Sequence, residues 1–243
     1  MQLNPQLIKN HFKKSIDKYE RHGIVQALMA DKLVAALRGD DFENILELGC
    51  GSGLLTKKLV ENVNYKEYYA NDIVDKSKVY LDKILKDYVF LCGDAQKINV
   101  NRKFDLIISN ALFQWFGKLE KVLNHYSNKL KSGGIIAFTT FGQDNYKEIK
   151  SLTGLSLDYM CVEEIEKIVT EQFELKSLEK FDYTLTFSNP LEVLLHMKNT
   201  GVNALGSQQW GVREVKEFCD RYKSEYPEIT LTYSPIIVVA QKR

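Results

Sequence analysis

The chain has 243 residues, enough for one sizeable core, and its 33 basic and 32 acidic residues leave a net charge of +1. This balance gives no global field that would attract nucleic acid, so we do not expect nucleic acid as a partner. The sequence shows no apolar signal region, no run near the roughly 20 apolar residues of a membrane span and no zinc-like cysteine spacing, which predicts a cytoplasmic protein without a metal site or a membrane partner.

The first half of the chain alternates helical patterns with short apolar runs. Pro5 suits the first turn of a helix, and one face of that helix then collects Ile8, Phe12, Ile16 and Tyr19. A second helix is expected at 24–38. Strands follow at 44–48, 67–71, 88–91, 104–109 and 134–141, with helices at 53–62, 75–86 and 118–130 between them. This alternation predicts an α/β fold with a parallel sheet.

The pattern changes after residue 141. Helical segments at 144–150 and 161–170 lead to an alternating strand at 173–187, a helix that begins at Pro190 and a last strand at 229–241. Two long β segments near the end of the chain predict a final antiparallel pair, with 188–226 inserted between them. We therefore expect a single domain over 1–243, in which the helices of 5–38 and the insertion 188–226 form a lid over one end of the sheet.

The segment "NILELGCGSGLL" places a carboxylate and three glycines where a strand gives way to a helix. Such a turn exposes backbone N–H groups that bind anions. The dinucleotide fingerprint G-x-G-x-x-G is not met, because the sixth position counted from Gly49 is Leu54. Glu47 would also repel a pyrophosphate, whereas it would attract a ligand that carries an ammonium group.

The arrangement of Glu47, Gly49, Gly51 and Gly53 resembles motif I of the class I S-adenosylmethionine-dependent methyltransferases. Their cofactor joins a zwitterionic amino acid to adenosine, so its carboxylate suits the amides of the turn and its ammonium suits nearby acids. The resemblance implies a Rossmann-like, seven-stranded and mostly parallel sheet with a terminal antiparallel strand. It also implies S-adenosyl-L-methionine as the cofactor.

Two further acids follow the next two strands. Asp72 lies 19 residues beyond Gly53, where a carboxylate can accept hydrogen bonds from ribose hydroxyls, and Ile73 follows it at the cofactor site. In the resembling family, an acid at the position of Asp94 binds the adenine amino group, with Ala95 beside the ring. Either acid alone is also typical of a cap or a turn, but acids at three successive strand ends favour a cofactor site.

The end of the fourth strand, "FDLIISNALFQWF", narrows the resemblance. Ser109 and Asn110 end the strand beside the expected methionine part of the cofactor, and Gln114 and Trp115 follow on a short helix at the mouth of the site. A Gln-Trp pair here resembles small-molecule carboxyl methyltransferases, notably the biotin-pathway malonyl-carrier-protein enzymes and the trans-aconitate enzymes. Trp115 also fits a plain packing role among its aromatic neighbours.

Segments in the rest of the chain favour the biotin-pathway malonyl-[acyl-carrier protein] O-methyltransferase family. "KYERH", "GGIIAFTTF", "GQDNYKEI", "LLHMKNTGVNAL" and "LTYSPIIVVA" resemble that family in the same order over nearly the whole chain. The resemblance implies methylation of the free carboxylate of a malonyl thioester, on acyl carrier protein or coenzyme A, in biotin precursor synthesis. Some members have an arginine in the helix that corresponds to 191–199, where this chain has Met197 and Lys198.

Several side chains at segment edges are candidates for recognising the malonyl carboxylate and for forming the acceptor side of the site: Tyr19, His22, Gln114, Trp115, Lys198 and Tyr233. Each also fits a structural role in the core or on the surface, so the choice among them stays open. Two other functions also stay open: methylation of a small free acid such as trans-aconitate, and cofactor binding by a non-catalytic partner protein.

The first helix carries a basic stripe, formed by Lys14, Lys18 and Arg21, on the side opposite its apolar face. A solvated helix face is one explanation. A docking surface for an acidic carrier protein is the other.

Overall fold

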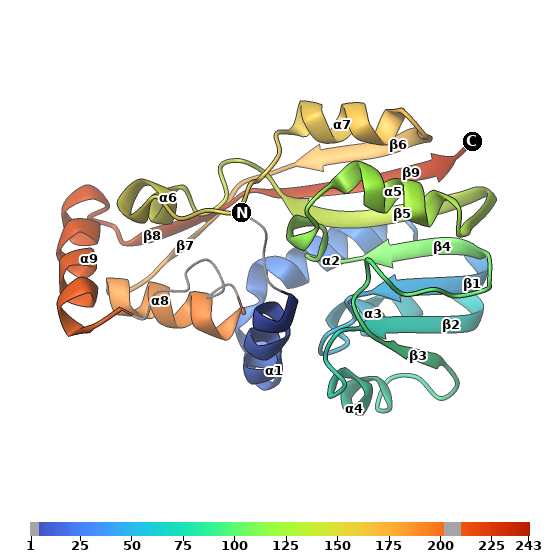
Figure 1. The fold of residues 1–243 in the computed structure, drawn as a ribbon, viewed down its shortest axis with the longest axis horizontal. Helices are drawn as coiled ribbons and strands as arrows, with labels where there is room; N and C mark the ends of the chain where they lie inside the picture. The colour runs from blue at the N-terminus through green and yellow to red at the C-terminus, as the bar shows by residue number, and fades with distance from the viewer. Residues whose placement is uncertain (1–4, 202–209) are drawn as a thin grey trace.

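The computed structural model describes residues 5–201 and 210–243. Its main sheet has seven strands in the order β3-β2-β1-β4-β5-β9-β6 (Figure 1). The strands lie at Asp41–Leu48 (β1), Asn64–Asp72 (β2), Val89–Cys92 (β3), Phe104–Ser109 (β4), Leu130–Phe141 (β5), Phe173–Lys180 (β6) and Pro235–Lys242 (β9). The pairs among β1–β5 are parallel, and β9 is antiparallel to β5 and β6. The predicted mostly parallel sheet is confirmed.

Helices cover both faces of this sheet because crossovers between parallel strands place them there. One face packs against helices Ile24–Ala35 (α2), Leu54–Val60 (α3) and Ser77–Leu81 (α4). The other packs against helices Leu119–Ser127 (α5) and Val162–Thr170 (α7). The helix predicted at 75–86 is shorter than expected, because after Leu81 the chain turns with three-residue hydrogen bonds such as Ile84 N–H to the Leu81 carbonyl (2.8 Å).

A second, two-stranded sheet extends beyond the end of the main one. It pairs Tyr183–Thr186 (β7) with Thr230–Tyr233 (β8) in antiparallel fashion. β6 leads into β7 and β8 leads into β9, so the predicted antiparallel pair is confirmed as two successive ladders. Helices Lys147–Thr153 (α6), Pro190–Asn199 (α8) and Val212–Glu225 (α9) accompany this extension (Figure 1).

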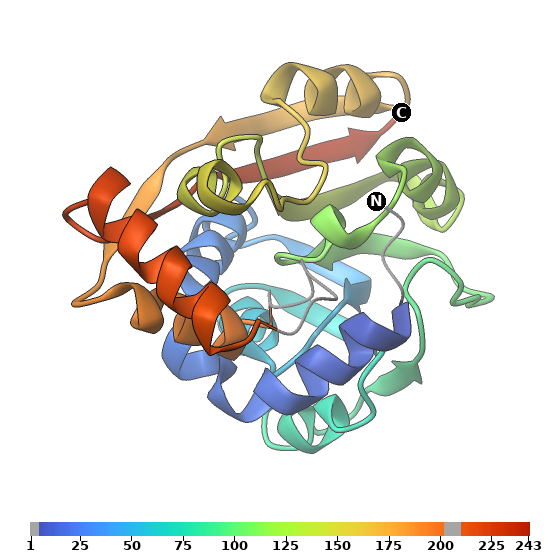
Figure 2. The same cartoon turned by 60° about the vertical axis from the view of Figure 1, so that its left-hand side comes forward.

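The start of α8 follows directly from its sequence. The Asn189 side chain accepts a hydrogen bond from the Glu192 N–H (3.1 Å), and Pro190 occupies the first turn, where its missing N–H costs nothing. At the other end, Gly201 has a φ of +78°, and a Cβ there would lie 2.9 Å from the Phe12 ring. The end of α8 therefore packs tightly against helix Pro5–His22 (α1), which lies at the carboxyl end of the sheet (Figure 2).

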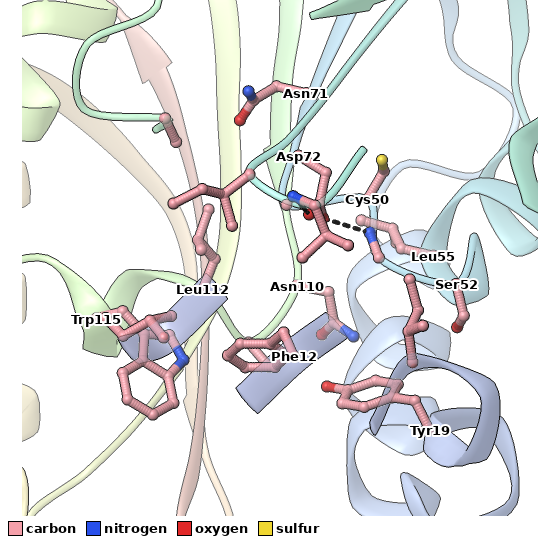
Figure 3. A pocket seen from close by; sticks show the side chains of 18 of the residues that line it. Phe12, Tyr19, Cys50, Ser52, Leu55, Asn71, Asp72, Asn110, Leu112 and Trp115 are labelled. Atoms are coloured by element: carbon pink, nitrogen blue, oxygen red, sulfur yellow. Dashed lines mark hydrogen bonds between the residues drawn. The ribbon is translucent and has the colours of Figure 1, made fainter. Parts of the chain in front are cut away.

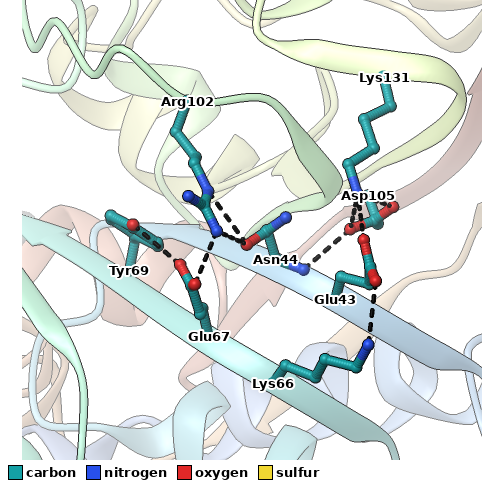
Figure 4. Close-up of polar contacts among 8 residues, drawn as sticks. All are labelled: Glu43, Asn44, Lys66, Glu67, Tyr69, Arg102, Asp105 and Lys131. Carbon is teal, nitrogen blue, oxygen red and sulfur yellow. Dashed lines mark hydrogen bonds and ion pairs between the residues drawn. The ribbon is translucent and has the colours of Figure 1, made fainter.

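The opposite, amino end of the sheet carries a network of charged side chains (Figure 4). Arg102 pairs with Glu67 (2.6 Å) and donates to the Asn44 side chain (3.0 Å), while Lys131 pairs with Glu43 (2.8 Å). Exposed pairs of this kind contribute little to stability individually. In the described part of the chain, no helix is both long enough and apolar enough to cross a membrane.

Candidate active site

A pocket lies at the carboxyl ends of β1, β2 and β4, where ligands bind in open α/β sheets (Figure 3). Its lining comes from α1, the turn after β1, the end of β2, the loop after β3 and the short 3-10 helix Phe113–Trp115 (η1). The space between its lining atoms, counted together with the part that opens to solvent, is about 1080 Å³.

The glycine turn after β1 forms one wall of the pocket. Gly49 and Gly51 line it, and Gly51 donates its N–H to the Asp72 carboxylate (2.8 Å). Gly53 does not line the pocket. Its φ is +83° and a Cβ would come within 2.4 Å of Ile84, so this glycine allows the turn to pack against the segment after α4.

Glu47 does not face the pocket, which corrects the expectation that its carboxylate meets a ligand. Side chains alternate along a strand, and Glu47 points with Ile45 toward α2 and α3. It is 1% exposed and accepts hydrogen bonds from Thr56 Oγ1 (2.6 Å) and Tyr68 Oη (2.5 Å). Burial raises the pKa of Glu47 to about 7, although both hydroxyls act in the opposite direction.

Asp72 ends β2 and lines the pocket with Ile73. Its two carboxylate oxygens accept the N–H groups of Gly51 (2.8 Å) and Val74 (2.7 Å). Burial raises the pKa of Asp72, and these backbone donors oppose the shift. Each oxygen keeps a further lone pair that can accept from a ribose hydroxyl.

Asp94 and Ala95 line the pocket from the loop after β3. An Asp94 oxygen accepts the Gln96 N–H (2.9 Å), which fixes the loop, and the Ala95 carbonyl accepts the Tyr126 hydroxyl. The loop thus presents a carboxylate beside a small side chain at the pocket, and the adenine role of this pair stays a prediction.

Ser109 and Asn110 end β4 but differ in position. Asn110 lines the pocket, and its amide joins the Gln26 carbonyl on α2 (3.0 Å) to the Thr139 hydroxyl on β5 (2.7 Å). Ser109 is buried behind the lining and donates to the Leu48 carbonyl (2.8 Å), so it ties β4 to β1.

On the acceptor side, the structure brings only Tyr19 and Trp115 of the six predicted residues into the lining (Figure 3). Gln114 turns back and donates to the Ala111 carbonyl (2.7 Å). Lys198 is exposed on α8. These two residues were therefore predicted at the pocket but lie outside it.

His22 and Tyr233 also lie outside the lining. His22 Nε2 is 3.3 Å from the Asn199 amide, and the buried Tyr233 hydroxyl is 2.6 Å from His196 Nε2. Burial, together with His22, lowers the pKa of His196 to about 4, so its ring is neutral at pH 7. No pattern in the sequence indicated His196, because its partner Tyr233 lies on another element 37 residues away.

Of the predicted lid, α1 alone lines the pocket among the described residues. Phe12 meets Trp115 edge to face, with ring centroids 5.7 Å apart, so the apolar face of α1 borders the cavity. α2 packs against the sheet instead, and the described residues of 188–226 support α1 from behind through α8. Whether these segments open and close stays a prediction.

Known proteins agree with this architecture. Residues 46–138 match the methyltransferase domain family model. The malonyl-[acyl-carrier protein] O-methyltransferase of Calditerrivibrio nitroreducens is 35% identical to the chain, and the alignment covers 96% of each protein. The enzyme of the same name from Chlorobium luteolum is 36% identical, and the alignment covers 98% of this chain and 95% of the relative. The N-methyltransferase NodS of Bradyrhizobium japonicum, solved with S-adenosyl-L-homocysteine, shares the fold with a TM-score of 0.56 at 13% identity, over 97% of this chain and 98% of its own. The chain belongs to the malonyl-[acyl-carrier protein] O-methyltransferase family of class I methyltransferases.

Proposed function

We propose that the protein transfers the methyl group of S-adenosyl-L-methionine to the free carboxylate of a malonyl thioester carried by acyl carrier protein. The observation that carries this proposal is the high identity, over nearly the full length, to relatives that bear that name. The pocket supports it, because Asp72, Asp94, Tyr19 and Trp115 line the same cavity. In this proposal Asp72 binds the ribose and Asp94 the adenine.

The chemistry suits the pocket. A carboxylate is already ionised at neutral pH, so it attacks without a general base. None of the described lining residues is a histidine or a lysine that could serve as such a base near pH 7. The task left to the protein is alignment of the carboxylate oxygen, the methyl carbon and the sulfonium sulfur, which can contribute roughly 7 to 11 kcal/mol.

Opposite charges are partly neutralised in the transition state, so exclusion of water favours the reaction. In this proposal the chain is one domain, and α1 closes the cavity while α8 holds α1 in place. The ester product masks a charged end, which lets enzymes that extend apolar acyl chains accept it. That role corresponds to biotin precursor synthesis in the cytoplasm. A small free acid such as trans-aconitate is the alternative acceptor, and coenzyme A the alternative carrier.

The basic stripe on α1 offers a test of the carrier. Lys14 and Lys18 are exposed, and neither has an ion-pair partner among the described residues. Changing both to glutamate is expected to raise the KM for malonyl-carrier protein severalfold at low salt, because carrier proteins of this kind are acidic. The KM for malonyl-coenzyme A should not rise.

Lys13 provides the matched control. It lies on the same helix but pairs with Asp75 (3.8 Å). Lys13→Glu therefore removes an exposed ion pair and leaves the charges of the basic stripe unchanged. Initial rates of methyl transfer, measured across a salt series, give the comparison. Equal use of the carrier protein by the parent and the double variant at low salt would show that α1 is not the docking surface.

A further inference from the structure

Two buried hydrogen-bond donors of the pocket lining, Ser52 Oγ and Trp115 Nε1, have no hydrogen-bond partner among the described residues, and Trp115 lies on the acceptor side. Trp115 is 7% exposed, and its Nε1–H has no hydrogen-bond partner among the described residues. Figure 3 shows this nitrogen on the side of the indole that faces Phe12, which also lines the pocket. A buried donor without a partner costs roughly 1 to 3 kcal/mol, so its retention in a pocket indicates a ligand that accepts from it.

The position of Trp115 is held by its backbone and by a neighbouring ring. The backbone N–H of Trp115 donates to the Leu112 carbonyl (2.9 Å), and the Phe12 ring contacts the indole edge to face. The donor is therefore held on an ordered support in the pocket wall, which lowers the entropy that binding must overcome.

A second neutral donor lies on the facing helix. Tyr19 lines the same pocket from α1. Burial, and then the nearby Tyr233 and Asp72, raise the pKa of Tyr19, so its hydroxyl stays protonated at neutral pH. Both polar groups on this side of the cavity are thus uncharged donors.

The described lining contains no lysine, arginine or histidine, and its charged residues are Asp72 and Asp94. An acceptor carboxylate bound here meets no positively charged side chain among the described lining residues. The cofactor's own sulfonium is then the cation that attracts it. A protein cation would bind the lone pairs that must attack, whereas a single N–H leaves the second oxygen free.

We propose that Trp115 is a catalytic residue whose Nε1–H binds one oxygen of the acceptor carboxylate, so that the carboxylate is recognised without a protein cation; this rests on the proposed function. The other oxygen gives a lone pair to form the O–CH₃ bond. The C–S bond breaks with its electron pair left on sulfur, which becomes a neutral thioether. The charges of −1 and +1 cancel, and no proton moves.

The first test is Trp115→Phe, which keeps an aromatic ring beside Phe12 and removes the N–H. Loss of one hydrogen bond to a charged group predicts a rise of at least tenfold in KM for malonyl-carrier protein. Affinity for S-adenosyl-L-homocysteine should change less than twofold. Trp210→Phe is the matched control, because Trp210 packs on Phe218 (ring centroids 5.1 Å apart) and lies outside the lining.

A second measurement keeps Trp115 intact and does not depend on how its variant folds. The sequence has two tryptophans, so Trp210→Phe leaves Trp115 as the sole tryptophan fluorophore. With S-adenosyl-L-homocysteine bound, saturation with malonyl-coenzyme A should shift the Trp115 emission, and the amide analogue of the malonyl group should shift it much less.

The outcomes separate the two proposals. If the parent methylates malonyl thioesters, but Trp115→Phe has the parent's KM or the emission stays unchanged at saturation, the role of Trp115 is overturned and the function stands. If the parent methylates no carboxylate acceptor, the proposed function falls and the inference falls with it.

Discussion

Replacing Asp72 with alanine is expected to lower the affinity for S-adenosyl-L-methionine at least a hundredfold. Two hydrogen bonds from ribose hydroxyls to a carboxylate, each worth roughly 1.5 to 3 kcal/mol, would be lost together. The same change removes the carboxylate that accepts the N–H groups of Gly51 and Val74. These two hydrogen bonds hold the glycine turn against the end of β2. Titration calorimetry with the cofactor measures the loss directly.

Two variants make this result interpretable. Asp72→Asn keeps a side-chain oxygen for one backbone N–H and should lose less affinity than the alanine variant. Asp75→Ala removes a nearby exposed acid, which pairs with Lys13 at 3.8 Å and lies outside the pocket lining, and should bind the cofactor as the parent does. Unchanged cofactor binding by Asp72→Ala would show that the ribose lies elsewhere.

Replacing Glu47 with glutamine is expected to stabilise the protein at pH 8 and to change little near pH 4. The pKa of Glu47 rises from 4.5 to about 7 on folding, so between these values the native state binds more protons than the unfolded state. The free energy of unfolding therefore falls as the pH rises through this window, by roughly 3 kcal/mol in total, and then levels off. Glutamine still accepts from Thr56 and Tyr68 but cannot ionise, so it removes this loss.

Urea unfolding at a series of pH values tests this prediction. Glu43→Gln is the control, because Glu43 lies at the exposed amino end of the sheet, where hydrogen bonds from Lys131 and Lys66 lower its pKa to about 2. A lowered pKa has the opposite effect on stability: the ionised Glu43 stabilises the folded protein above pH 4.5, and this stabilisation is lost as the pH falls. Glu43→Gln therefore gives no gain in stability at pH 8. A parallel pH dependence for the parent and Glu47→Gln would refute the raised pKa of Glu47.

The elements that the sequence predicted best are those whose pattern is local. The strand expected at 104–109 is β4 with the same bounds. A short apolar run between a charged loop and a polar end indicates a buried strand. Helix α8 begins at Pro190 as expected, because its cap and first turn lie in adjacent residues. The parallel arrangement of the first five strands also followed, because alternating strands and helices leave few other arrangements.

The direction of Glu47 could not be predicted from the sequence. Both faces of β1 are buried, so the run around Glu47 has no polar face to show which side it occupies. Its partners Thr56 and Tyr68 lie 9 and 21 residues away on separate elements. Lys198 illustrates the same limit, because the helical pattern of 190–199 does not show which residues turn toward α1 and which toward solvent.

The recognition of the acceptor also required the structure. The sequence offered six candidates for the acceptor side, neutral donors and possible cations alike, and did not decide among them. Of these six, the described pocket lining contains only Trp115 and Tyr19. A missing cation and an unused donor are properties of a three-dimensional lining, and no spacing in the sequence displays them.

Methyl transfer from labelled S-adenosyl-L-methionine, with malonyl-carrier protein, malonyl-coenzyme A and trans-aconitate offered side by side, tests the central claim most directly. The account predicts the highest kcat/KM for malonyl-carrier protein, a lower value for malonyl-coenzyme A and negligible transfer to trans-aconitate. Preferred methylation of trans-aconitate, or no transfer to either malonyl thioester by a folded protein that binds the cofactor, would contradict it.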